Sequence, residues 1–360
     1  MKTCGIIVEY NPLHYGHIHH IKESRNKSQC DCLIAIMSGN FVQRGEMAIV
    51  DKWTRAKEAI KHGVDLVVEL PYPFATSSAD YFAKGGVELL KLLKVDQMIF
   101  GSESNDLAKL EALIDKKSLG DFHHSYAYNF FKQYPLLSND LLGLCYIKEL
   151  QNSNIKYDCI KRNNNYFDSS MDQNIASASA IRQSIINHQP YEHTTPMQPL
   201  DDTFQWENYY ALLQYLLMSI DEDTLSNIYL VHEGIHLLFK KQAYLHDNYE
   251  DFIRACTSKR YPRSKLQRIL VQILNQCLKS DIENLPKLNY IRPLAFNDIG
   301  KQYLNTIKKE IHIASKFNQI PIEYRLLEQK ASQVYFYPLN NKLRLEAIKK
   351  EWKSPCYISL

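Results

Sequence analysis

The first half of the chain alternates short apolar runs with longer stretches in which apolar positions recur at helical spacing. The run at residues 4–8 is apolar and rich in β-branched residues, which predicts a buried parallel strand, and further strands are predicted at residues 33–37, 66–70 and 98–100. Another short strand is predicted at residues 155–160. The intervening stretches predict helices at residues 17–27, 52–62, 79–93 and 141–150, the last preceded by the capping cluster Ser138-Asn139-Asp140. Alternation at this spacing is typical of an α/β fold, in which helices cover a parallel sheet.

The pattern changes after Pro190. Residues 192–201 are rich in Thr and Pro and predict a linker. Helical spacing dominates beyond it, at residues 206–219, 224–230, 233–245 and 266–278, and no further strand is expected. The sequence therefore predicts a Rossmann-like domain with a parallel sheet over residues 1–190, followed by a mainly α-helical domain over residues 200–360.

Composition favours a soluble protein with a substantial core. Of 360 residues, 45% are hydrophobic, and neither an apolar signal region nor an apolar span of about 18 residues is visible, so we expect a cytoplasmic protein without a membrane partner. The eight cysteines lie mostly singly among apolar residues and indicate reduced thiols. A formal net charge of +3 does not by itself indicate nucleic acid, so the distribution of charge matters more.

Residues 9–17, read as EYNPLHYGH, join the first predicted strand to the first predicted helix. Gly16 has no Cβ, so a ligand can approach the backbone closely where the amides of a new helix point outward. His14 and His17 lie three positions apart and can both donate to phosphate oxygens. This His-x-Gly-His pattern is typical of the nucleotidylyltransferase superfamily. The alternative is a metal site, since His19 and His20 follow, but no Cys-x-x-Cys or His-Glu-x-x-His accompanies the cluster and we predict no protein-held metal.

A second motif follows the last predicted strand of the first half. Residues 177–182, SASAIR, resemble the superfamily's second signature, in which small hydroxyl residues precede Ile-Arg. Ser177 and Ser179 at a helix start can bond phosphate oxygens, and Arg182 can clamp a leaving pyrophosphate. Without the first motif, the two serines would be interpreted as ordinary helix caps.

One basic block stands out in the second half. Residues 254–268 contain six Lys or Arg side chains, an aromatic ring and no acidic residue; the candidate RNA contacts are Lys259, Arg260, Tyr261, Arg263 and Arg268. Such a block can meet several phosphates while the ring offers a stacking face. The alternative is a solvated helix end without a partner.

Further motifs make the resemblance specific. In chain order they are EYNPLHYGH, MSGNFVQRGE with Asp51, Lys52 and Arg55, DLVVELP, FGSE, SNDLLG, IKR, SASAIR and SKRYPRSKLQRIL. Over nearly its whole length the chain resembles the tRNA(Met) cytidine acetate ligase family. The resemblance implies that ATP activates acetate as acetyl-adenylate, and that the acetyl group passes to the wobble cytidine of elongator tRNA(Met) to give N4-acetylcytidine.

The resemblance also implies an ATP site. Its residues are Ile7, Val8, Glu9, Tyr10, Asn11, Pro12, Leu13, His14, Tyr15, Gly16, His17, Ile18, His19, His20, Gly101, Asn139 and Arg162. The loop residue Ser102 and the hydroxyls of Ser177 and Ser179 are added as candidate contacts. Tyr15 fills the variable position of the first motif, and the Asn-rich run at residues 163–165 departs from the family pattern.

The chemistry can be argued from the residues. A carboxylate that attacks the α-phosphate is already an anion and needs alignment and charge neutralisation, which His14, His17 and Arg182 can supply as catalytic residues. Mg²⁺ held mostly by the triphosphate is expected from the chemistry. Two alternatives stay open: an adenylyltransferase acting on a phosphorylated small molecule, and a non-catalytic RNA-binding protein. The first leaves the helical region and its basic block without a role.

Overall fold

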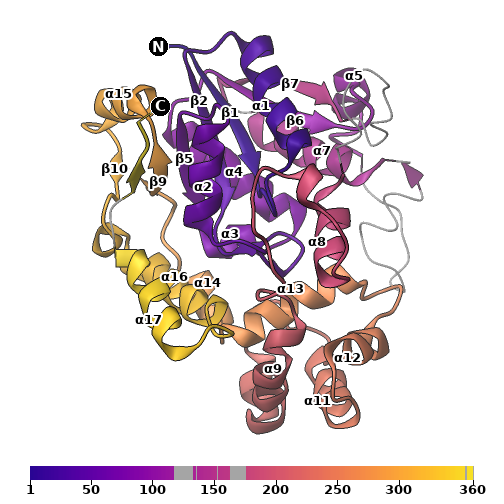
Figure 1. The fold of residues 1–360 in the computed structure, drawn as a ribbon. Helices are drawn as coiled ribbons and strands as arrows, with labels where there is room; N and C mark the ends of the chain where they lie inside the picture. Colours follow the sequence, from indigo (N-terminus) through magenta and orange to yellow (C-terminus); the bar gives the residue numbers. More distant parts are fainter. Residues whose placement is uncertain (117–132, 135, 152, 163–175, 353–354, 360) are drawn as a thin grey trace.

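A central sheet organises the first half of the chain (Figure 1). The computed structural model describes residues 1–116, 133–134, 136–151, 153–162, 176–352 and 355–359. In this part of the chain the sheet has seven strands in the order β11-β9-β5-β2-β1-β6-β7. The five predicted strands are confirmed as β1 (Thr3–Val8), β2 (Cys32–Ser38), β5 (Leu66–Leu70), β6 (Gln97–Ser102) and β7 (Lys156–Lys161), all mutually parallel.

The four helices predicted in the first half are confirmed as α1 (Tyr15–Ser28), α2 (Lys52–Lys61), α4 (Ala79–Leu92) and α7 (Ser138–Leu150). The first half also contains α3 (Tyr72–Ala75), α5 (Leu107–Glu111) and α8 (Ala178–Ile186). A small hairpin, β3 (Phe41–Val42) and β4 (Glu46–Met47), follows β2. The loop at residues 163–172 and Ile175, part of the second predicted motif region, lie outside the described residues.

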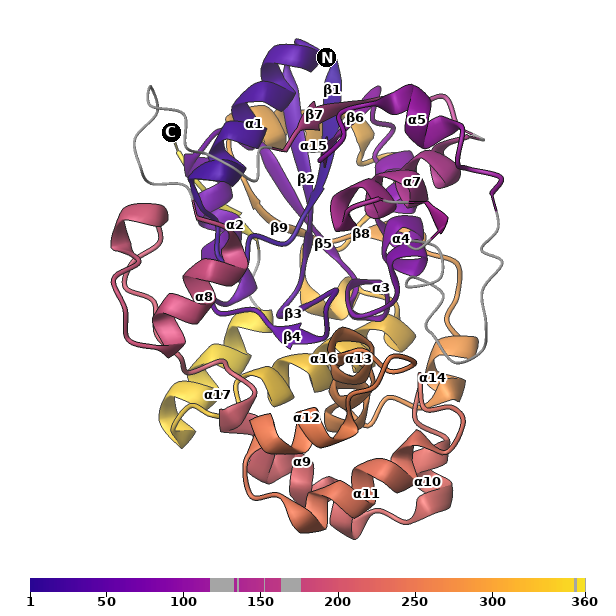
Figure 2. The same ribbon diagram turned by 90° about the vertical axis from the view of Figure 1, so that its right-hand side faces the viewer.

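The second half is largely helical (Figure 2). It contains α9 (Glu207–Ser219), α10 (Glu222–Ser226), α11 (Ile235–Leu245), α12 (Tyr249–Cys256), α13 (Arg263–Leu274), α14 (Lys279–Glu283), α15 (Asp298–Ile307), α16 (Ile322–Tyr335) and α17 (Asn341–Lys349). The predicted helix at residues 224–230 ends at Ser226, and Leu230 has a left-handed backbone with φ of 65°. The predicted helix at residues 266–278 begins earlier, at Arg263, and ends at Leu274.

The expectation of no strand beyond Pro190 is wrong. The strands there are β8 (Tyr290–Ile291), β9 (Pro293–Phe296), β10 (His312–Ile313) and β11 (Cys356–Tyr357). Strand β9 pairs antiparallel with β5, with a register shift between Val67 and Val68 opposite Pro293, and β11 pairs with β9. These strands have two to four residues, which is too few for a periodic pattern in the sequence. Pro293 is tolerated in β9 because it lies at the start of the strand, opposite the irregularity in β5. A domain division near residues 190–200 stays a prediction, but part of the second half completes the sheet of the first.

A buried network of charges fastens this late segment to the sheet. Lys52 Nζ lies 2.6 Å from Glu69 Oε1 and 2.9 Å from Glu351 Oε2, and Arg292 contacts the same two carboxylates at 2.8 and 2.9 Å. All four side chains are buried. Burial raises the pKa of the adjacent Glu328 to about 8, assisted by Glu69. Because two cations then face two carboxylates, the network is balanced in charge, and removing one member would leave a buried ion unpaired.

Candidate active site

A buried arginine fixes the carboxyl ends of β1 and β2. Arg55 of α2 donates to the backbone carbonyls of Glu9 at 2.6 Å, Ser38 at 3.1 Å and Val50 at 2.8 Å, and also to that of Gly39. Its side chain is fully buried, and burial lowers its pKa. Arg55 therefore stabilises the loops at the sheet edge where ligands of parallel α/β folds bind.

The His-x-Gly-His turn presents two imidazoles at the start of α1. His14 is the N-cap residue, and its Nδ1 accepts a hydrogen bond from the backbone N–H of Gly16 at 3.1 Å. The Nδ1 of His17 accepts from the backbone N–H of His14 at 3.4 Å, and the two rings stack with centroids 3.8 Å apart. Since both Nδ1 atoms accept, each neutral ring carries its hydrogen on Nε2. Both rings therefore offer Nε2–H donors above the helix start.

Burial keeps these rings neutral. Burial, assisted by the Arg162 guanidinium, lowers the pKa of His14 to about 3 and that of His20 to about 4. The pKa of His17 falls well below its ordinary value through burial, then through His14 and Arg162. Among the described residues, His14 Nε2, His20 Nε2 and the Tyr10 hydroxyl are buried without a hydrogen-bond partner. Such orphaned polar atoms side by side indicate a place for a polar ligand.

Facing the His-x-Gly-His turn, the other side of the candidate site is formed by the ends of β6 and β7 and the start of α7. Arg162 donates from Nη1 to Asn139 Oδ1 at 2.7 Å, and Asn139 donates in turn to Glu103. A Cβ added at Gly101 would lie 3.9 Å from Cδ of Arg162. The hydroxyl of Ser102 donates to Asp140. The structure thus brings Gly101, Ser102, Asn139 and Arg162 together, and Arg162 lies close enough to the histidines to influence all three pKa values.

Arg182 reaches the site from α8. Its Nη1 donates to the backbone carbonyl of Asn11 at 2.8 Å, and its Nη2 lies 2.8 Å from Glu46 Oε2 and 3.5 Å from the Ser179 hydroxyl. Ser177 is the N-cap of α8 and accepts from the backbone N–H of Ala180 at 3.2 Å. The guanidinium therefore lies against the His-x-Gly-His loop, and a role in clamping pyrophosphate stays a prediction.

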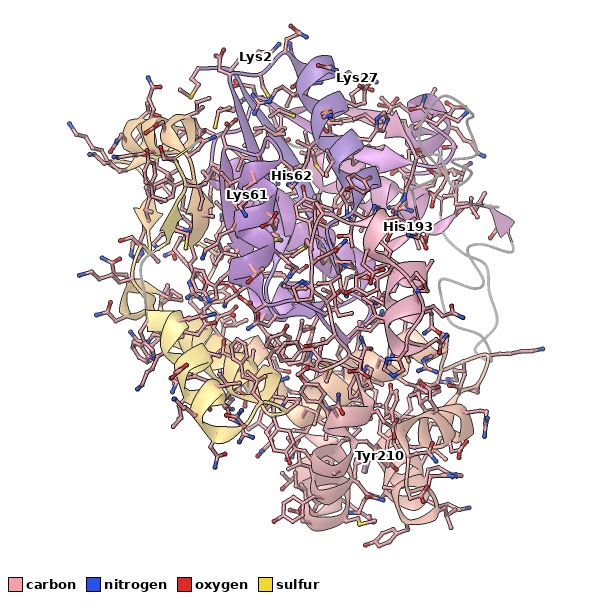
Figure 3. The ribbon with its side chains drawn as sticks, viewed as in Figure 1. Lys2, Lys27, Lys61, His62, His193 and Tyr210 are labelled. Carbon is pink, nitrogen blue, oxygen red and sulfur yellow. The ribbon has the colours of Figure 1, made fainter. Side chains whose placement is uncertain are left out.

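The predicted linker also contacts this loop. The Thr195 hydroxyl donates to the carbonyl of Leu13 at 2.5 Å, and Met197 packs in the same apolar cluster as Leu13. Figure 3 labels the neighbouring His193, which is exposed. Residues 192–201 thus support the first motif as well as connecting two halves.

The remaining predicted ATP contacts lie around the same turn. Tyr10 and Leu13 are buried in the core beneath the histidines, and Tyr10 meets His17 edge to face with ring centroids 5.1 Å apart. Burial raises the pKa of Glu9, whose Oε1 accepts from the backbone N–H of Gln43 at 2.7 Å. The other predicted contacts belong to β1, to the turn after it or to the first turns of α1; they are Ile7, Val8, Asn11, Pro12, Tyr15, Gly16, Ile18 and His19.

Part of the basic block is paired with carboxylates from other segments. Arg263 contacts both oxygens of Glu250, at 2.7 and 2.5 Å, and Arg260 and the Tyr261 hydroxyl both contact Glu233. Lys265 Nζ lies 4.0 Å from the Tyr261 ring centroid. The sequence shows no acidic residue within the block, so this neutralisation was not visible there. RNA binding by Lys259, Arg260, Tyr261, Arg263 and Arg268 stays a prediction.

Within the described residues, no group of three His, Cys, Asp or Glu side chains is arranged to hold a metal ion. In the same part of the chain, none of the helices has the length and apolar character needed to cross a membrane.

A parallel sheet whose first strand enters a helix through a His-x-Gly-His turn, with donors converging on the helix start, defines a nucleotidylyltransferase. A sequence model of the HIGH nucleotidyl transferase family matches residues 1–350. The tRNA(Met) cytidine acetate ligase of Anoxybacillus flavithermus (strain DSM 21510 / WK1) is 36% identical, with 99% of each chain covered. That of Caldanaerobacter subterraneus subsp. tengcongensis is 37% identical over 89% of this chain and 90% of the relative. The chain belongs to the tRNA(Met) cytidine acetate ligase family.

A solved structure agrees with this assignment. The crystal structure of Thermotoga maritima TmcAL bound with alpha-thio ATP superimposes with a TM-score of 0.86 and 27% sequence identity, covering 100% of both chains. The α/β fold with a helical C-terminal region, expected from the sequence, is therefore confirmed.

Proposed function

We propose that this protein uses ATP to activate acetate and transfers the acetyl group to N4 of the wobble cytidine of elongator tRNA(Met). The observation that carries the proposal is the pair of neutral imidazoles at the start of α1, with the His14 Nε2 buried and unpartnered within the described chain. The family's relatives are ligases by name, and TmcAL from Thermotoga maritima binds an ATP analogue.

In the first step an acetate oxygen forms a bond to the α-phosphorus of ATP. The bond from that phosphorus to the oxygen bridging to the β-phosphate breaks, and pyrophosphate leaves with its electron pair. The Nε2–H groups of His14 and His17 donate to phosphate oxygens and stabilise the charge that develops there. Arg182 would exchange its contact with Glu46 for the leaving pyrophosphate, because a guanidinium binds phosphate oxygens in a bidentate manner.

Arg162, Asn139, Gly101 and Ser102 form the side of the candidate site that faces the His-x-Gly-His turn. Arg162 adds a second cation facing the phosphates, and Gly101 leaves room for a ligand beside it. A magnesium ion would be held by the triphosphate, since the described side chains offer no metal cluster of their own. It would neutralise phosphate charge when bound.

In the second step the N4 amine of cytidine attacks the acetyl carbonyl carbon. A C–N bond forms, the bond from that carbon to the AMP oxygen breaks, and the amine loses one proton. The base must leave the anticodon loop to reach the pocket, as bases do in other enzymes that act on nucleobases. The helical region with its basic block would hold the tRNA.

The test is an assay with ATP, Mg²⁺ and pure protein, with and without acetate and unmodified elongator tRNA(Met). Pyrophosphate release and tRNA nucleosides, analysed by mass spectrometry, are followed together. We expect acetate-dependent pyrophosphate release and new N4-acetylcytidine. Pyrophosphate release only with a phosphorylated metabolite would instead indicate a small-molecule adenylyltransferase, and no release at all would indicate a binding protein.

A further inference from the structure

The hairpin β3–β4 lies directly on the backbone of α13. Gly45 at its turn has φ of 73°, and a Cβ added there would come 2.2 Å from the backbone nitrogen of Arg268. The indole N–H of Trp206 donates to the carbonyl of Gly45 at 3.2 Å. The hairpin is therefore packed against the helical region so closely that no side chain fits between them.

This contact brings together Arg44 and Arg268, which form no ion pair with any carboxylate that the structure describes. Arg44 is exposed, Arg268 is half-buried, and within the described part of the chain neither lies within ion-pair distance of an Asp or Glu. In contrast, Arg254, Arg260 and Arg263 of the same block are all paired. Burial is the main cause that lowers the pKa of Arg268 to about 10; the charge of Asp80 opposes this shift, and that of Arg44 adds to it. Neither guanidinium is held in an ion pair within the described residues, so both are available to an anionic ligand at the contact between the hairpin and α13.

The same hairpin continues into the candidate active site. Glu46, two residues beyond Arg44, pairs with Arg182, and the backbone N–H of Gln43 donates to Glu9. Two residues span at most about 7 Å, and the turn at Gly45 makes the separation shorter. A phosphate held by Arg44 and Arg268 would therefore lie next to the site and on the side facing the helical region.

This inference rests on the proposed function. We propose that Arg44 and Arg268, together called the seam, bind phosphates of the tRNA backbone beside its reactive cytidine. The seam contributes more to RNA binding than the paired arginines of the basic block, because Arg260 and Arg263 would first have to release their own carboxylates. It also places one phosphate contact on the hairpin and one on α13, so RNA would bridge the two.

The experiment measures binding of fluorescently labelled, unmodified elongator tRNA(Met) to the full chain at several salt concentrations. The variants are Arg44→Ala, Arg268→Ala and the double variant, with Arg254→Ala as the matched control. Each seam variant should bind about tenfold more weakly. The slope of log K against log salt concentration should fall by about 0.7–0.9 per variant and about twice that in the double variant.

Two further measurements distinguish a folding defect, an error in the seam proposal and an error in the proposed function. Arg268→Lys keeps the charge and should restore the wild-type slope, which a folding defect would not allow. If the wild-type protein acetylates the tRNA but both seam variants bind like Arg254→Ala, the seam proposal is overturned while the proposed function stands. If the wild-type protein neither binds nor acetylates the tRNA, the proposed function fails and this inference fails with it.

Discussion

Replacing His14 by Asn should make the protein less sensitive to acid. His14 is buried, and burial holds its pKa at about 3, well below the value near 6.5 of an exposed imidazole. Asn keeps a side-chain oxygen that can cap α1 by accepting from the Gly16 N–H, but it cannot take up a proton. The substitution therefore removes one titrating group and keeps the local structure.

The expected magnitude follows from proton linkage. Above pH 6.5 the ring is neutral in both the folded and unfolded states and contributes no pH dependence. Below pH 6.5 the unfolded chain binds a proton that the folded chain excludes, so the free energy of unfolding falls as the pH falls, until the pH reaches about 3. One pKa unit corresponds to about 1.36 kcal/mol, so His14 should cost about 2 kcal/mol of stability at pH 5.

Urea unfolding at pH 7.5 and pH 5 measures this difference. Between these pH values, the wild-type protein should lose about 2 kcal/mol more unfolding free energy than His14→Asn. His193→Asn, which replaces an exposed histidine, is the matched control (Figure 3). If wild type and His14→Asn lose equal stability between pH 7.5 and pH 5, the ring is not held neutral by burial and the argument for an Nε2–H donor is wrong.

Three other substitutions test the site and its supports. His17→Ala should slow acetate-dependent pyrophosphate release by on the order of 100- to 1,000-fold while leaving the fold intact, since one donor to the developing charge is lost; near-normal release would contradict the assignment. Gly45→Ala should lower the unfolding free energy by about 1–3 kcal/mol, because its left-handed backbone and the α13 contact exclude a Cβ; wild-type thermal stability would mean the hairpin is not fixed there. Lys52→Met should cost about 3–5 kcal/mol in urea unfolding by leaving Glu69 and Glu351 short of a cation; unchanged stability would refute that role.

The sequence predicted the features that depend on local pattern. Strands β1, β2, β5 and β6 were visible because each contains a buried apolar run, whereas the edge strand β7 is of mixed composition and partly exposed. The imidazoles of His14 and His17 were visible because one turn contains both. Strands β9 and β11 were not visible, since strands of two to four residues carry no period. They form because the edge of β5 offers backbone partners.

Long-range charge pairing was equally invisible. The basic block contains no acidic residue, yet Glu233 and Glu250 reach it from segments 13 to 28 residues away in sequence. Arg55 belongs to a motif that the sequence identified, but its part in holding Glu9 and Ser38 could be recognised only from its contacts. In both cases the missing information was the spatial neighbour and not the residue type.

The long sequence separation between β5 and β9 affects folding during translation. During synthesis, β5 is complete once residue 70 has emerged, but its antiparallel neighbour begins at residue 293. At about 5–20 residues per second, the ribosome needs on the order of 10–40 s to deliver that neighbour. Throughout that interval the apolar run Leu66–Leu70 has an open edge, which is a template for pairing with another nascent chain. Overproduction on crowded polysomes should therefore give aggregates seeded by this edge, and slower initiation or a chaperone that covers β5 should raise the soluble yield.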